Sequence, residues 1–161
     1  MNPLVYVGIA EYKILDRPGL LACSALGSCV GVCLWDPDTK LAGLLHILLP
    51  TVKSSNLKDN PAKFADRGIE QLVLEMERRG ATRRRLRAKL VGGACLYHYE
   101  GNCAATEIGD RNVAASRAAL RSLGIPVLAE HVGGKFGRSI RFDRDNFEIR
   151  VTVLTHGVSV I

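Results

Sequence analysis

The stretch that decides the fold is SCVGVCLW at residues 28–35, DPDT at residues 36–39 and KLAGLLHILL at residues 40–49. Two apolar segments separated by a short polar turn predict a β-hairpin. Pro37 fits the second position of a type I turn because its ring fixes φ. One face of this hairpin is entirely aliphatic, and we expect it to face the core: Val30, Val32, Leu34, Leu41, Leu45 and Ile47.

The register of this hairpin decides whether a cysteine meets a histidine. A loop centred between Pro37 and Asp38 places Cys29 directly opposite His46. Directly opposed residues share a face of the sheet and have Cβ atoms about 4.5–5.5 Å apart. We therefore expect the thiol and the imidazole to be in contact, whereas a slip of one residue would place them on opposite faces.

Two helices are predicted in the rest of the chain. Apolar residues at helical spacing over 65–76, between Pro61 and Gly80, predict the first, and a pattern beginning near Asp110 and ending at Gly124 predicts the second. Strands are expected at residues 5–9, 28–35, 40–49, 86–91, 125–129, 138–142 and 147–154.

This order of elements predicts an α+β fold for a single domain spanning residues 1–161. We expect antiparallel or mixed β-sheets, with about two helices covering a sheet face. The chain has 161 residues, of which 47% are apolar and 24% charged, close to the averages for globular domains with their own core.

No targeting or membrane segment is expected. No apolar run approaches the roughly 20 residues that span a bilayer, and residues 1–7 lack the basic and apolar regions of a secretory signal. The five cysteines are an odd number, and nothing directs the chain to an oxidising compartment. We therefore expect reduced thiols and a cytoplasmic protein.

The net charge of +6 is concentrated in one stretch. Residues 78–89 contain seven basic residues and no acid, whereas the rest of the chain has 15 basic and 16 acidic residues. We expect Arg85, Arg87 and Lys89 to form the solvated face of a half-buried strand. The alternative is a docking patch for an acidic partner. Nucleic acid is not expected as a partner, because no aromatic residues are interleaved with these charges.

The pairing of Cys29 with His46 has two interpretations. A thiol beside an imidazole is a candidate nucleophile and base, because a nearby imidazolium lowers the pKa of the thiol. Alternatively, Cys29 and Cys33 are small apolar core residues and His46 is a hydrogen-bonded core histidine. Spacing alone leaves both open.

Longer motifs favour the first interpretation. They run across nearly the whole chain: LGSCV at 26–30, WDP at 35–37, HILLP at 46–50, KFAD at 63–66, VGGA at 91–94, IGDRNV at 108–113, GG at 133–134 and RS at 138–139. In content and order they resemble the CheD family of chemoreceptor glutamine deamidases.

This resemblance implies that Cys29 is the nucleophile and His46 the base. It also implies a papain-like Cys–His site on a fold similar to that of bacterial deamidating toxins. The family usually has a threonine six residues before the nucleophile, where it orients the histidine, and here Cys23 stands at that position. A thiol is a weaker hydrogen-bonding group than a hydroxyl. The candidates for the orienting group are therefore Cys23, the neighbouring Ser24 and a backbone carbonyl.

The reaction implied by the resemblance is hydrolysis of a glutamine side chain to glutamate through a thioester on Cys29. Backbone N–H groups near Gly27 and Ser28 would stabilise the oxyanion, because glycine permits close backbone approach. His46 would protonate the departing ammonia and then activate water. The reaction requires no metal and no organic cofactor.

The resemblance also implies two protein partners. The substrates would be the cytoplasmic helices of chemoreceptors, and the second partner would be a CheC-type phosphatase. The absence of the orienting threonine favours an alternative function: a non-catalytic or weakly catalytic module that binds chemoreceptors and the phosphatase.

A metal site is a rival use of the remaining cysteines. Cys95, His98 and Cys103 lie close in sequence, but they lack the paired C-x₂-C elements of zinc sites. We therefore expect no bound metal.

Overall fold

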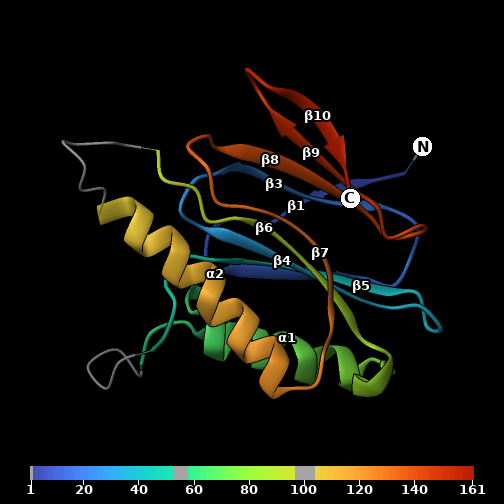
Figure 1. The fold of residues 1–161 in the computed structure, drawn as a ribbon. Helices are drawn as coiled ribbons and strands as arrows, with labels where there is room; N and C mark the ends of the chain where they lie inside the picture. The colour runs from blue at the N-terminus through green and yellow to red at the C-terminus, as the bar shows by residue number, and fades with distance from the viewer. Residues whose placement is uncertain (1, 53–57, 97–103) are drawn as a thin grey trace.

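The residues that the structure describes form two five-stranded β-sheets and two α-helices, arranged in layers (Figure 1). The computed structural model describes residues 2–52, 58–96 and 104–161. The first sheet contains, in spatial order, β1 (Leu4–Tyr6), β3 (Leu20–Leu26), β8 (Arg138–Asp143), β9 (Ile149–Val153) and β10 (Gly157–Val160). The second contains β2 (Glu11–Leu15), β5 (Leu41–Ile47), β4 (Val30–Asp36), β6 (Arg87–Gly92) and β7 (Val127–Val132).

Both sheets are mixed. Strand β1 runs parallel to β3 and β6 parallel to β7, and the other neighbouring pairs are antiparallel. Helices α1 (Ala65–Arg78) and α2 (Ala104–Ser122) lie on one face of the second sheet, on the side away from β8 and β9 in Figure 1. The α+β class, the mixed sheets and the two covering helices are as predicted.

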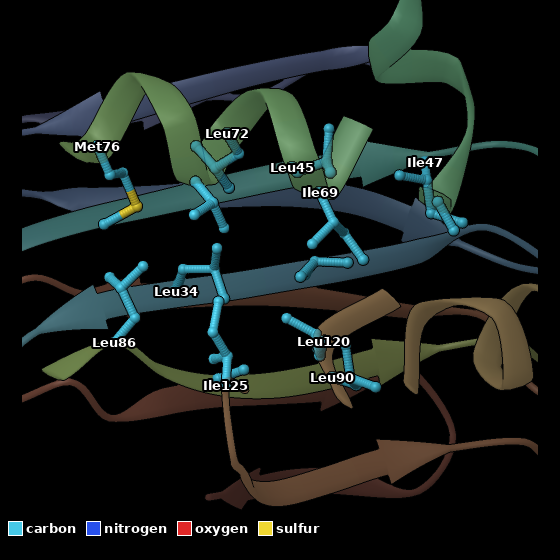
Figure 2. Packing of buried hydrophobic residues seen from close by; sticks show 14 of the residues in the cluster. Leu34, Leu45, Ile47, Ile69, Leu72, Met76, Leu86, Leu90, Leu120 and Ile125 are labelled. Atoms are coloured by element: carbon cyan, nitrogen blue, oxygen red, sulfur yellow. The ribbon is translucent and has the colours of Figure 1, made fainter. Parts of the chain in front are cut away.

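Two apolar layers hold these elements together. In the layer between helices and sheet, Ile69, Leu72 and Met76 of α1 point towards β4 and β5 (Figure 2). The aliphatic face of the predicted hairpin lies in this layer, as expected. The other face of β4 and β5 is also buried, because it packs against the first sheet through residues such as Trp35 and Phe142.

The ends of the helices differ from those predicted. Asn60 accepts a hydrogen bond from the N–H of Ala62, but it caps a 3₁₀ turn at Pro61–Lys63, and α1 begins only at Ala65. Helix α2 begins at Ala104, well before the predicted start. Gly109 therefore lies inside the helix, where a Cβ would approach the carbonyl oxygen of Gly93 to 2.7 Å. Glycine at this position lets the helix pack closely on the loop that contains Gly93.

Strands β2, β3 and β10 were not predicted. Strand β3, LLACSAL, shows no simple alternation, because its pairing with β8 is interrupted by a bulge between Cys23 and Leu26. Ala25 within the bulge has a φ of 53°. An inserted residue breaks the two-residue period on which the prediction depends.

The predicted hairpin forms, but its register is shifted by two residues. Asp36 pairs with Leu41 and Gly31 pairs with His46, so Cys29 is not directly opposite His46. The turn has four residues instead of two, because the Asp36 carboxylate accepts the N–H groups of the turn and Lys40 adopts a left-handed φ of 60°. A shift of two residues preserves the faces, so the predicted sidedness holds.

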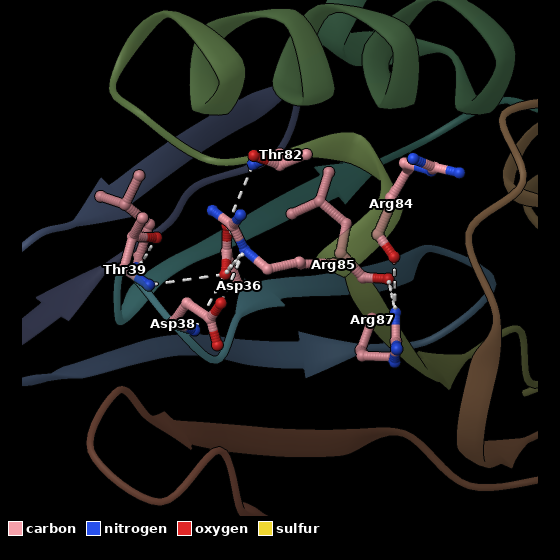
Figure 3. Close-up of polar contacts among 9 residues, drawn as sticks. Asp36, Asp38, Thr39, Thr82, Arg84, Arg85 and Arg87 are labelled. Atoms are coloured by element: carbon pink, nitrogen blue, oxygen red, sulfur yellow. Dashed lines mark hydrogen bonds and ion pairs between the residues drawn. The ribbon is translucent and has the colours of Figure 1, made fainter.

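The basic stretch does not form a simple solvated face. Arg85 donates to the fully buried carboxylate of Asp36, with Nη2 2.9 Å from Oδ2 (Figure 3). Lys89 is half-buried, and its Nζ lies 2.8 Å from the carbonyl oxygen of Phe147 and 5.2 Å from the ring centroid of Trp35. The prediction of a solvated face was wrong for Arg85, which is bound to Asp36, and for Lys89, which contacts the turn between β8 and β9 of the first sheet and the C-terminal segment.

Candidate active site

Cys29 lies in the short bend, residues 27–29, that connects β3 to β4 in the opposite sheet. The bend is held by two backbone hydrogen bonds: the N–H of Gly93 donates to the carbonyl of Cys29, and the N–H of Ala94 donates to that of Gly27, both at 2.8 Å. Gly92 has a φ of +121°, and a Cβ at this position would lie 2.2 Å from the carbonyl oxygen of Cys29. The bend therefore requires a glycine beside it.

Asn112 connects this bend to the strand that carries the histidine. It is fully buried on α2, and its Nδ2 donates to the carbonyl oxygens of Ser28 at 2.8 Å and Leu48 at 3.0 Å. Leu48 is the first residue after β5, which carries His46. No role was predicted for Asn112 from the sequence, although a buried amide within an amphipathic helix usually has specific partners.

His46 is 3% exposed and lies near the end of β5. Its direct partners are Gly31 of β4 and Glu11 of β2. Continuing this register places Cys29, one residue before β4, at the diagonal position to His46 on the same side, where long side chains still reach each other. Neither ring nitrogen of His46 has a hydrogen-bond partner within the described ranges.

The three candidate orienting groups lie in different environments. Cys23 is buried on β3, and its thiol donates to the carbonyl of Val7 at 3.5 Å. Ser24 is exposed. The carbonyl of Val7 is also close enough to His46 to favour its protonated form, although no hydrogen bond of good geometry joins them.

Burial disfavours charge on all of these side chains. The pKa of His46 is lowered by burial, which outweighs the opposing effects of the Val7 carbonyl and Glu11. The pKa of Cys29 is raised by burial, opposed in part by its own backbone N–H. Burial and the nearby Cys29 raise the pKa of Cys23 to about 12. The resting site therefore holds neutral thiols and a neutral imidazole at neutral pH.

The chain is similar to known proteins along its whole length. The family model described as CheD chemotactic sensory transduction matches residues 48–153. A probable chemoreceptor glutamine deamidase CheD from Desulfitobacterium hafniense is 43% identical over 161 residues, covering 100% of both chains. The chain belongs to the CheD family. A probable chemoreceptor glutamine deamidase CheD from Caldanaerobacter subterraneus subsp. tengcongensis is 44% identical and covers 99% of both chains.

A further relative and a solved structure are also similar to this chain. A chemoreceptor glutamine deamidase CheD from Halalkalibacterium halodurans is 39% identical, covering 98% of both chains. The crystal structure of the Bacillus licheniformis hypothetical protein YfiH aligns with a TM-score of 0.46 at 18% identity, covering 74% of this chain and 49% of that one.

In this CheD-family chain, two backbone N–H groups at the Cys29 bend have no backbone or side-chain acceptor on another described residue. Those of Ser28 and Cys29 donate to no other residue in the described part of the chain. The N–H of Cys29 instead lies close to its own sulfur. Donors beside a nucleophilic atom are well placed for an oxygen that becomes negative during attack.

The structure also tests the predictions about reduced cysteines, a metal site and a membrane span. Cys23, Cys29 and Cys33 are free thiols, but Cys95 is disulfide-bonded, which contradicts the prediction that all five cysteines are reduced. His98 and Cys103 of the rival metal site lie outside the described residues. Within the described ranges, no cluster of three metal-ligating side chains occurs, and no helix is long and apolar enough to cross a membrane.

Proposed function

We propose that this protein hydrolyses side-chain amides of chemoreceptor glutamines to glutamates, with Cys29 as nucleophile and His46 as base. The observation that carries the proposal is the environment of His46. It is buried, neutral, without a hydrogen-bond partner in the described residues, and diagonal to a thiol. A buried polar group left unsatisfied in a native protein usually has a functional reason.

The first half of the reaction forms a thioester. Neutral His46 accepts the thiol proton as the Cys29 sulfur attacks the amide carbon of glutamine. The carbonyl oxygen becomes an oxyanion and accepts hydrogen bonds from the N–H groups of Ser28 and Cys29. The imidazolium then gives its proton to the amide nitrogen, the C–N bond breaks, and ammonia leaves.

The second half releases the product. Water replaces ammonia beside His46, which takes a proton from the water as its oxygen attacks the thioester carbon. The C–S bond breaks, the sulfur recovers its proton from the imidazolium, and the glutamine has become a glutamate. No metal or organic cofactor takes part in this scheme.

We assign the orienting role to the carbonyl of Val7. This carbonyl favours the protonated form of His46, whereas the Cys23 thiol is already directed at Val7 and remains protonated. The Cys23→Ala variant is then expected to keep kcat within about threefold, because the orienting group is backbone. A loss of about a hundredfold or more would assign the role to Cys23.

The test of the function is a mass measurement. The protein is incubated with a chemoreceptor cytoplasmic fragment, and glutamine-containing peptides are examined for the gain of about 1 Da that marks amide hydrolysis through the covalent route. Cys29→Ala should abolish the gain. Cys33→Ala is the control, because this thiol belongs to the same buried cluster as Cys29 but has no described contact with His46. Turnover by Cys29→Ala would overturn the proposal.

A second function is favoured by the raised pKa of the Cys29 thiol. A site without a resting thiolate is compatible with a regulatory module that binds chemoreceptors and a CheC-type phosphatase in the cytoplasm with little turnover. In that case the unmodified protein would bind the receptor fragment, and Cys29→Ala would bind it equally, yet neither would change its mass.

A further inference from the structure

A cavity of about 690 Å³ lies at the other end of β6 from the candidate active site. Residues 124–127, which connect α2 to the start of β7, contribute to its lining. Arginines from three separate elements surround it: Arg84 from the 3₁₀ turn at Arg83–Arg85, Arg87 from β6, and Arg117 and Arg121 from α2. Cys29, in contrast, packs beside Gly92 at the opposite end of β6.

The fold sorts the arginines of the basic stretch into two groups. Arg78 and Arg79 pair with Glu75, Arg83 pairs with Glu77, and Arg85 pairs with Asp36. Arg84 and Arg87 line the cavity, and neither has an acidic partner in the described part of the chain.

Figure 3 shows the division directly. Arg85 points back to Asp36, while the neighbouring Arg84 points away from it. Among the described residues, the Arg87 guanidinium donates only to the carbonyl oxygens of Arg84 and Leu86, at 3.2 and 2.9 Å. Arg84 and Arg87 therefore keep positive charges that no carboxylate in the described part of the chain balances.

Helix α2 adds to this excess. Arg117 and Arg121 are four residues apart, so they lie on the same face of the helix and repel each other. Glu130 compensates Arg117 through a bidentate pair, with Nε 2.8 Å from Oε1. The cavity lining then has four arginines and one glutamate, a formal charge of +3. An anionic ligand would relieve this repulsion.

The volume of the cavity and the open edge of β7 beside it favour an extended ligand. It is too large for one small anion, since roughly 300–1,000 Å³ is the size of sites for drug-sized molecules. It also borders β7, the last strand of its sheet, whose outer edge has no neighbouring strand in the described residues. A peptide can add main-chain hydrogen bonds at such an edge while its carboxylates meet the arginines.

We propose that this cavity is a docking site for an acidic segment of a partner protein. Guanidinium groups bind carboxylates in bidentate fashion, and their placement on three elements fits several carboxylates along one chain. The site is separate from Cys29, so the proposal holds whether or not the protein is a deamidase.

The test measures binding of a fluorescent glutamate octapeptide by anisotropy at about 50 mM salt, where charge pairs are weakly screened. The double variant Arg84→Gln/Arg121→Gln should weaken binding about tenfold or more. The matched control, Arg78→Gln/Arg79→Gln, removes the same charge at residues that pair with Glu75, and should change affinity less than twofold. Cys29→Ala should bind like the unmodified protein, which separates this result from the proposed function.

Three results would overturn the proposal. The first is no binding of the peptide by the unmodified protein. The second is an equal loss in both double variants, which would show that only net charge attracts the peptide. The third is tighter, arginine-dependent binding of inorganic phosphate or a single-stranded DNA oligonucleotide, which would assign the cavity to a small anion or to nucleic acid.

Discussion

The Nδ2 atom of Asn112 lies 2.8 Å from the carbonyl oxygen of Ser28, so a buried amide on α2 holds the bend that carries Cys29. The same atom reaches the carbonyl of Leu48 at 3.0 Å, next to the strand that carries His46. The proposed nucleophile and base belong to different elements, and Asn112 bridges the backbone beside each of them. We therefore regard it as a positioning residue.

Replacing Asn112 should affect the chemical step more than substrate binding. In Asn112→Ala, two carbonyls lose their donor and the bend can move relative to β5, so kcat for ammonia release should fall about 10–100-fold. KM should change by less than about threefold, because no contact with substrate is removed. Steady-state kinetics on a receptor fragment separate the two parameters.

The control is one turn further along the same helix. Ser116 is also fully buried, and within the described ranges its hydroxyl donates only to the carbonyl of Asn112. Ser116→Ala should lower the free energy of unfolding by about 1 kcal/mol, the usual cost of one lost hydrogen bond. Its kcat should stay within about twofold of that of the unmodified protein. An equal fall in kcat for both variants would mean that Asn112 acts only through stability.

The Gly92 position should tolerate no side chain. A Cβ there would lie 2.2 Å from the carbonyl oxygen of Cys29, so Gly92→Ala must displace the bend or the strand. We expect a loss of about 3 kcal/mol or more in the free energy of unfolding, together with loss of activity. Chemical denaturation and ammonia release measure the two effects.

Gly124 provides a matched comparison for that change. It also has a positive φ, +72°, but a Cβ there would contact nothing within 4 Å. Gly124→Ala should therefore cost only the backbone strain, about 1 kcal/mol, and leave activity unchanged. Similar losses in both variants would show that the approach to Cys29 is unimportant.

The three free thiols should differ in reactivity. Cys29 is 9% exposed, against 1% for Cys23 and 0% for Cys33, and burial raises the pKa of all three thiols. Iodoacetamide reacts with the thiolate, so Cys29 should be labelled at least about tenfold faster than the other two, with a rate that still increases above pH 9. Native labelling followed by peptide mass spectrometry measures this profile.

His46→Asn tests the resting state of the pair. If His46 takes the proton only during attack, this variant should lose deamidation while the pH profile of Cys29 labelling stays nearly unchanged. A labelling midpoint below about 8.5 that rises in His46→Asn would instead reveal a resting thiolate–imidazolium pair.

Asp36 should stabilise the protein above acidic pH. Burial alone would raise the pKa of its carboxyl group, but hydrogen bonds from Arg85 and from the turn N–H groups lower it to about 2 from the usual 3.8. The folded state therefore favours the carboxylate, and this stabilisation, about 2 kcal/mol, is present above pH 3.8 and lost as the pH falls towards 2.

Thermal unfolding of Asp36→Asn measures that contribution. The variant should have a lower Tm than the unmodified protein at pH 7, and the difference should shrink between pH 3.8 and 2. Asp38→Asn is the control, because Asp38 is exposed and reaches Arg85 only at 3.3 Å. A difference between Asp36→Asn and the unmodified protein that is independent of pH would contradict the role of the carboxylate.

Some of this structure follows from local patterns alone. The alternation in residues 28–49 correctly separated the face that packs on the helices from the face that carries Cys29 and His46. Helix α1 was predictable because its apolar residues repeat at helical spacing between Pro61 and Gly80. The resemblance to the CheD family was carried by short motifs whose residues lie in order along the chain, and the comparisons confirmed it.

Other features could not be predicted, because they depend on contacts between distant segments. The hairpin register follows from a four-residue turn whose Asp36 carboxylate also binds Arg85, 49 residues away. The bulge in β3 interrupts the alternation by which a strand is predicted. The contacts of Asn112 depend on which loops α2 covers, and local sequence does not specify this.

The amino-acid order by itself determined the family, the class of fold and the pairing of a thiol with an imidazole as the candidate chemistry, because these are written in local spacing and short motifs. Only the tertiary structure decided which charges are compensated, how deeply the thiol is buried and which backbone group lies beside the imidazole. Burial and electrostatic interactions depend on distance in space, and the folded chain brings together residues that the sequence keeps far apart.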